Sequence, residues 1–312
     1  MVNKNKNKNK KLNLGIELPP VQAFAYESHP DLPKVHQQIL VNGARGSGKT
    51  IAAVNLMKKL DYDRIFLVSP TARSNHAILS MLDIDQDDIY DDPDDPDIID
   101  NIKAEIEQEA EAYDLYHEQM VKYKEFLKYK QNYPFKIPDE LLIEFYDPVN
   151  KSFIEPQHWL NGRRCRMAIL FDDIVGSRLF SKGVRKVNAL AILHRHVGPV
   201  KAEGGGALGV STFYLSQTYT IQTGGITKAI RNNITSLILF KTKSEKEYKQ
   251  IEEEIAGEVG PDTFKKVYDY AVNEPHSFLF VDLHPKEHHP SKFRKRFDEF
   301  IIVDDNNDIK NL

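Results

Sequence analysis

The chain has 312 residues, of which 41% are hydrophobic and 28% charged, enough for one large α/β domain or two small ones. The formal net charge of −4 excludes a global field that would draw the protein to nucleic acid, so any contact with DNA must come from local basic surface. The lone cysteine, Cys165, excludes an internal disulfide and is typical of a reducing compartment. Without an apolar run long enough for a membrane span, or a signal peptide, the sequence predicts a soluble intracellular protein.

The chain begins with a segment that should not belong to a folded core. Asparagine and lysine alternate over residues 3–11, which predicts a disordered basic tail. Residues 12–34 carry four prolines and predict an extended lead-in that packs on the domain. We therefore expect residues 1–34 to precede a single domain that covers residues 35–312.

A phosphate-binding loop follows a short apolar strand at 36–42. Its pattern is G-x-x-x-x-G-K-[ST], and an apolar stripe at helical spacing over 51–60 follows it. The glycines allow the backbone to wrap an anion, Lys49 would reach the β- and γ-phosphates, and the hydroxyl of Thr50 would bind Mg²⁺. The predicted nucleotide-binding residues are Gly43, Ala44, Arg45, Gly46, Ser47, Gly48, Lys49 and Thr50.

Continuous apolar runs mark the strands of the domain. They lie at 36–42, 64–69, 166–171, 211–216, 235–240 and 277–282. Such runs, separated by helical stretches, predict a mostly parallel sheet with helices on both faces, in an α/β fold. The ligands of these sheets collect at the carboxyl ends of the strands, where Gly43, Asp172 and Gln217 all fall.

Residues 72–165 form an insert between the second and third of these strands. Its first part, Asp83 to Asp100, holds ten aspartates in eighteen positions and predicts a solvated loop. A long helix should follow over 102–130, where Ile106, Tyr113, Met120 and Leu127 recur at heptad spacing. Two arrangements remain open for this helix: it packs on the flank of the domain, or it protrudes as an arm toward a neighbouring subunit or capsid component.

Two aspartates and a glutamine are candidates for the metal binding, water activation and phosphate sensing that a phosphate loop alone does not provide. Asp172 and Asp173 close an apolar strand, so Asp172 would hold Mg²⁺ and Asp173 would orient and deprotonate the attacking water. The alternative is that the pair merely caps the next helix. Gln217 ends the following strand and would sense the γ-phosphate, unless it is an ordinary polar strand end.

Two arginines are candidates for a finger that completes the site of an adjoining subunit. Arg195 lies in the sequence His194-Arg-His196, and Arg231 lies between Ile230 and Asn232. Either arginine could instead be a structural ion-pair partner. Arg195 is slightly favoured.

These motifs occur in an order that resembles a known family. The phosphate loop, 169–173, Arg195-His196, 215–219 and 230–240 together resemble the virion DNA-packaging ATPases of poxviruses and other large nucleocytoplasmic DNA viruses, within the FtsK–HerA superfamily. The resemblance covers roughly residues 36–283. It implies a RecA-like core, ATP and Mg²⁺ as ligands, a homo-oligomeric ring, and translocation of double-stranded DNA into a preformed capsid. Unlike the family, the chain has residues 199–209 between the Arg-His pair and the sensor strand.

The resemblance also implies the surroundings of the protein. A viral capsid or portal-vertex component would be its partner, and the host cytoplasm, the viral factory or the virion its location. Two other functions remain open: a P-loop kinase of a small molecule, and a non-catalytic nucleotide-binding assembly factor. Phosphate transfer to an acceptor in place of water would favour the kinase.

The composition of residues 285–312 predicts a C-terminal tail that is basic in its first part and acidic in its second. Residues 292–297 are a compact basic stretch with two phenylalanines, which either binds DNA or docks on the domain through its aromatic rings. His284, His288 and His289 lack a cysteine partner and do not predict a zinc site.

Overall fold

The computed structural model describes residues 26–219, 225–304 and 309–311. The expected basic tail at 3–11 and most of the expected lead-in lie outside the described residues. Residues 26–34 do pack on the domain, because the Tyr26 hydroxyl donates to the carbonyls of Cys165 (2.9 Å) and Leu208 (3.1 Å). Within the described part of the chain, none of the helices combines the length and the apolar character needed to cross a bilayer.

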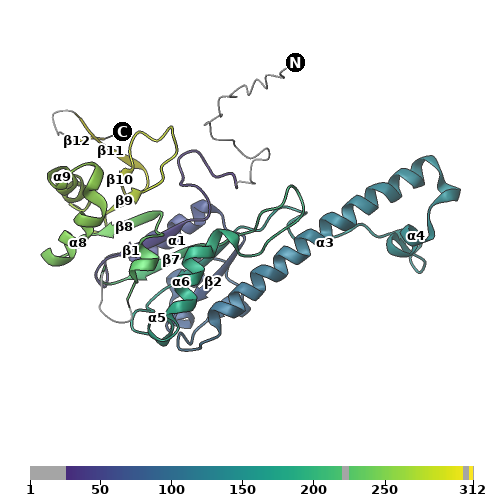
Figure 1. Ribbon diagram of the computed structural model, residues 1–312, viewed down its shortest axis with the longest axis horizontal. Helices are drawn as coiled ribbons and strands as arrows, with labels where there is room; N and C mark the ends of the chain where they lie inside the picture. Colours follow the sequence, from purple (N-terminus) through teal and green to yellow (C-terminus); the bar gives the residue numbers. More distant parts are fainter. Residues whose placement is uncertain (1–25, 220–224, 305–308, 312) are drawn as a thin grey trace, which may run out of the picture.

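One sheet organises the described domain, in the order β12-β11-β10-β9-β8-β1-β7-β6-β2-β3 (Figure 1). The strands from β8 to β3 are parallel to their neighbours, whereas β9 to β12 form an antiparallel meander beside β8. Its strands are β1 Gln38–Asn42, β2 Arg64–Val68, β3 Ile89–Tyr90, β6 Met167–Phe171, β7 Ser211–Ser216, β8 Ser236–Phe240, β9 Phe278–Asp282, β10 Phe293–Lys295, β11 Glu299–Val303 and β12 Ile309–Asn311. The predicted α/β class, with a mostly parallel sheet, is confirmed.

Helices cover both faces of the sheet, as the continuous apolar strands predicted. Ile39 and Val41 of β1 point to one face and Leu40 to the other, and the two faces belong to separate apolar clusters. The helices α1 Lys49–Leu60 and α2 His76–Met81 cover the first face. The second is covered by α3 Ile98–Asn132, α5 Arg178–Ser181, α6 Val184–Leu193, α8 Glu245–Ile255 and α9 Pro261–Ala271, with the short α7 Lys228–Arg231 beside them.

The insert 72–165 contains an arm. The first half of α3 buries Ile102, Ile106 and Tyr113 against the sheet, and the second half leaves the domain (Figure 1). There it carries α4 Asp139–Phe145 and the small sheet of β4 Tyr146–Asp147 and β5 Ser152–Phe153. The helix therefore packs on the flank of the domain over its first half and protrudes from it over its second half. The insert also contributes β3, which pairs with β2 at the edge of the main sheet.

The end of the described chain is not a tail, which corrects the expectation for 285–312. Residues 292–297 contain β10 and dock through aromatic rings: Phe293 is 3% exposed, and Phe297 packs on Phe278. Arg294 is buried with its guanidinium over the ring of Phe300, 4.1 Å from the centroid. Arg294 and Lys295 of this stretch are buried and Arg296 is exposed, so the stretch docks on the domain through its aromatic rings.

Candidate functional site

The phosphate loop has the predicted strand, turn and helix around it. Two of its glycines have positive φ angles, 76° at Gly46 and 104° at Gly48, where an L-residue would be strained. Gly43 is needed for space, because a Cβ there would lie 2.7 Å from both the Ser47 hydroxyl and the Cβ of Phe240. The loop is therefore closely packed at Gly43, whereas residues 44–46 are exposed to solvent.

Lys49 spans the phosphate loop. Its Nζ donates to the carbonyls of Gly43 (2.8 Å) and Ala44 (3.1 Å), and partial burial lowers its pKa, although Asp172 and Asp173 act in the opposite direction. Inside the loop, the Ser47 hydroxyl is a buried polar atom without a hydrogen-bond partner among the described residues. An anion bound by the loop would give the Ser47 hydroxyl a partner and Lys49 a charged acceptor, so these residues fit a polyphosphate.

The two aspartates that follow β6 lie in different environments. Asp172 is 4% exposed and accepts from the side-chain amide of Asn75 at 3.3 Å. Burial, followed by the negative charge of Asp173, raises the pKa of Asp172 to about 6, while Lys49 lowers it. Asp173 is exposed and has a φ of 51°, a left-handed conformation that aspartate adopts more readily than most residues.

Strand order places Gln217 beside the acids. β7 lies between β1, which leads into the phosphate loop, and β6, which leads into Asp172 and Asp173. The amide of Gln217 points to the Asp173 carboxylate, with 3.5 Å between Nε2 and Oδ1. Lys49, the acid pair and Gln217 therefore meet at one edge of the sheet, as their positions at strand ends predicted.

The two arginines lie elsewhere. Arg195 is exposed in the short 3-10 helix η4 His194–His196. The neighbouring His194 ring contacts the carbonyl of His36, just before β1, so Arg195 lies at the amino edge of the sheet, opposite the phosphate loop. Arg231 is held within its own chain, since its guanidinium donates to Glu254 (3.2 Å) and to the Ile226 carbonyl (2.8 Å). The geometry thus gives Arg231 a structural partner and leaves Arg195 exposed.

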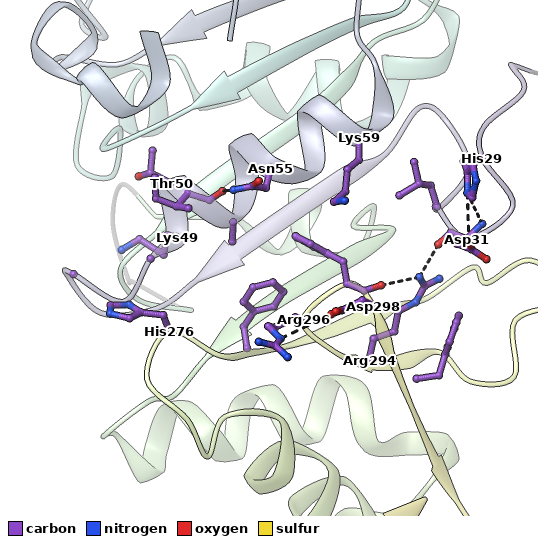
Figure 2. Close-up of a pocket in the computed structure, with 18 residues that line it drawn as sticks. His29, Asp31, Lys49, Thr50, Asn55, Lys59, His276, Arg294, Arg296 and Asp298 are labelled. Atoms are coloured by element: carbon purple, nitrogen blue, oxygen red, sulfur yellow. Dashed lines mark hydrogen bonds and ion pairs between the residues drawn. The ribbon is translucent and has the colours of Figure 1, made fainter. Parts of the chain in front are cut away.

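A large pocket opens from the phosphate loop (Figure 2). The strand order places it on the β9 side of β1, away from the acids that follow β6. It has a volume of about 1440 Å³ and lies between α1 and the antiparallel strands. Phe278, Phe297 and Phe300 give it apolar walls, and Figure 2 shows Lys59, His276 and Arg296 around it. A ligand with charged and flat apolar parts, such as a nucleotide, could place its charged part in the loop and its ring here.

No cluster of three or more His, Cys, Asp or Glu side chains that could hold a metal occurs in the described part of the chain. Two of the three histidines of 284–289, His288 and His289, contact the carbonyl of Pro30. A magnesium ion needs fewer protein ligands, because it keeps several waters and binds the phosphates of its nucleotide. The Thr50 hydroxyl and the Asp172 carboxylate are oxygen donors of that kind.

Glu247 is a residue of this edge that sequence reasoning missed. It stands three residues after Ser244, a spacing that indicates an ordinary capping box at the start of a helix. The Ser244 hydroxyl does accept from the Glu247 amide, but the Glu247 carboxylate turns away to three strand ends. It accepts from the Asn42 side chain (3.2 Å), the Tyr219 amide (2.5 Å) and the Thr242 hydroxyl (2.6 Å).

These contacts make Glu247 a positioning residue, because Asn42 precedes the phosphate loop and Tyr219 follows Gln217 by two residues. We expect Glu247→Ala to lower kcat for ATP by about 10-fold or more, since losing the acceptor leaves buried donors unpaired at about 1–3 kcal/mol each. Affinity for ATP should change only a few-fold. Steady-state hydrolysis and equilibrium binding separate the two effects.

Two further variants control this prediction. Glu247→Gln keeps an oxygen acceptor and should retain most of the turnover. Glu245→Ala removes an exposed carboxylate two residues earlier on the same helix and should have no effect. Equal losses in the alanine and glutamine variants, or a loss of thermal stability with unchanged kcat, would refute the positioning role.

No family model matches the chain, and the search of curated proteins found no match. Similar solved structures include the genome packaging NTPase B204 from Sulfolobus turreted icosahedral virus 2. Its complex with sulfate is 12% identical with a TM-score of 0.44, and the match covers 86% of this chain and 96% of that one. Its complex with ATP-gammaS is 12% identical with a TM-score of 0.42, and the match covers 86% of this chain and 97% of that one. The pCW3 conjugation coupling protein TcpA is another, with 16% identity and a TM-score of 0.40, and the match covers 85% of this chain and 61% of that one. At these identities and TM-scores the likeness carries no conclusion about activity, substrate or partner.

Proposed function

We propose that this protein is an ATP-driven motor that translocates double-stranded viral DNA into a preformed capsid. One observation carries the enzymatic part of the proposal: Lys49, the Asp172–Asp173 pair and Gln217 follow the carboxyl ends of the neighbouring strands β1, β6 and β7, at one edge of the sheet. The order and spacing of these motifs, which resemble viral packaging ATPases, support the choice of DNA as the polymer and of a capsid or portal-vertex component as the partner.

In this proposal the triphosphate lies in the phosphate loop with its terminal phosphate toward the acids. Because the acids and the large pocket lie on opposite sides of β1, the base and sugar then extend toward Phe278 and Phe297. Lys49 compensates phosphate charge. Thr50 and Asp172 hold Mg²⁺, which neutralises the charge of the phosphates when it is bound.

Hydrolysis would then use the exposed acid. Asp173 takes the proton of the attacking water, as a carboxylate within hydrogen-bond reach can do. Gln217, already in contact with Asp173, responds to the presence of the terminal phosphate and passes the change to the segment beyond β7. Arg195 of one subunit completes the site of the next in a homo-oligomeric ring, while Arg231 keeps its internal partner Glu254.

The motor is tested by ATP hydrolysis with and without double-stranded DNA. We expect hydrolysis that requires Mg²⁺ and rises several-fold with DNA of any sequence, because a translocating motor must grip the backbone and not the bases. Hydrolysis that is indifferent to DNA refutes the motor. Phosphate transfer to a small acceptor assigns the chain to the kinases instead. Location in the host cytoplasm, viral factory or virion follows from the same proposal.

A further inference from the structure

The turn between β10 and β11, residues 296–298, lies at the nucleotide-binding edge of the sheet. β8 is parallel to β1 and ends at this edge, and the antiparallel pairing of β9 with β8 and of β10 with β9 brings the end of β10 back to it. The Arg296 amide donates to the carbonyl of Phe278, the first residue of β9 (2.9 Å). Three strand spacings, about 14 Å, separate β10 from β1. The turn is therefore a spatial neighbour of the phosphate loop, although it is far from it in sequence.

Two residues with unusual backbone conformations flank Phe278 at this edge. His276 has a φ of 61° and Arg296 a φ of 55°, in the left-handed region that non-glycine residues rarely adopt. Both side chains are exposed, so core packing does not enforce these conformations. His276 contacts the phosphate loop, with 3.1 Å between its Nδ1 and the Ser47 carbonyl oxygen. Figure 2 shows both residues on the pocket wall opposite α1, and disfavoured backbone of this kind is typical of ligand-binding segments.

Arg296 differs from the two basic residues before it. Arg294 is buried with two backbone carbonyls as acceptors, and Lys295 is buried with the Glu274 carboxylate 2.7 Å away. Arg296 is exposed, and 3.8 Å separates its Nε from the Asp298 carboxylate. An anionic group bound in the pocket would give this guanidinium a closer charged acceptor.

Phe297 places an aromatic surface beside that charge. Its ring packs edge to face on Phe278 and on Phe280, with centroids 4.9 Å and 5.6 Å apart. Phe297 is only half-buried and lines the pocket, whereas Phe280 is 1% exposed and lies behind the lining residues. The turn thus presents a positive charge and an aromatic ring, side by side in sequence, to one pocket.

We propose that Arg296 and Phe297 form a nucleotide clamp, in which Phe297 packs on the base and Arg296 binds the α-phosphate. A triphosphate whose terminal phosphate points to the acids places its α-phosphate, sugar and base on the β9 side of β1, where the turn lies. Aromatic rings bind bases by stacking, and arginine binds phosphate through charged hydrogen bonds. The clamp rests on the proposed function only in that a nucleoside triphosphate occupies the phosphate loop.

Calorimetric titration of the full chain with ATP or with inorganic triphosphate, each with Mg²⁺, tests the clamp. Phe297→Leu keeps an apolar side chain against Phe278 but removes the ring, so it should weaken ATP binding by about tenfold and leave triphosphate binding unchanged. Arg296→Gln removes the charge and should weaken both ligands by about tenfold, because inorganic triphosphate also places a phosphate at the α position.

Two variants serve as matched controls. Phe280→Leu makes the same change in the ring behind Phe297, so it should lower the melting temperature and leave the affinity for ATP unchanged. Arg185→Gln removes an exposed cation on α6, outside the pocket, and should change neither affinity. Thermal melting of every variant shows whether a loss of binding reflects a loss of the fold.

Three results would overturn the clamp. These are a wild-type protein that binds ATP no more tightly than inorganic triphosphate, a Phe297→Leu variant that weakens both ligands equally, and an Arg296→Gln variant that binds both normally. The expected binding pattern together with hydrolysis that is indifferent to DNA would support the clamp and refute the motor. The failure of the clamp and the failure of the proposed function are therefore distinguishable.

Discussion

Replacement of Lys49 by alanine is expected to weaken ATP binding by about 100-fold or more, which corresponds to about 2.7 kcal/mol. The ammonium group has no competing carboxylate hydrogen bond in the described chain: it donates only to the carbonyls of Gly43 and Ala44, which a phosphate would replace as stronger, charged acceptors. Calorimetric titration with ATP and Mg²⁺ measures the effect directly.

The fold should tolerate this change. Lys49 is half-buried and burial lowers its pKa, so the charged group is not solvated as well as in water and its removal should cost little stability. Lys58→Ala, an exposed lysine in the last turn of the same helix, is the matched control and should bind ATP normally. Unchanged ATP affinity in Lys49→Ala would place the nucleotide elsewhere.

Local sequence predicted the parts of the site that depend on a single strand end. The phosphate loop and the acid pair each follow a continuous apolar run, and such runs identify buried strands. Because parallel strands bring their carboxyl ends to one edge, the meeting of Lys49, Asp173 and Gln217 could be predicted without coordinates. The three residues lie close together because β7 is between β1 and β6 in the sheet.

Features built from distant segments could not be predicted in this way. The large pocket needs β9 to β11 to fold back beside α1, and the basic composition of 292–297 concealed the burial of Arg294 under Phe300. Glu247 carried only a capping signal, since its partners Asn42 and Tyr219 are far from it in sequence. Hydrophobic periodicity in α3 indicated a single stripe, although Ile106 and Tyr113 pack on the domain while Leu127 is exposed on the arm.

The substitution Asp173→Asn should leave ATP bound and lower turnover by about 10²–10⁴-fold, the contribution of a positioned general base. An amide oxygen can still accept from Gln217, but it cannot take a proton from water. Asparagine also suits the left-handed backbone at this position, where φ is 51°, so the loop should keep its shape. Single-turnover hydrolysis together with equilibrium ATP binding separates chemistry from affinity.

Asp61→Asn provides a control matched in both chemistry and backbone. Asp61 is exposed at the end of α1 with a φ of 54°, so the same change is made in the same conformation away from the acids. Its turnover should equal that of the wild type. If Asp173→Asn hydrolysed ATP at the normal rate, the water would have to be activated by another group. Full biological activity of a variant that binds but does not hydrolyse ATP would favour a scaffold that uses the nucleotide only for stability, because a motor cannot do work on DNA without turnover.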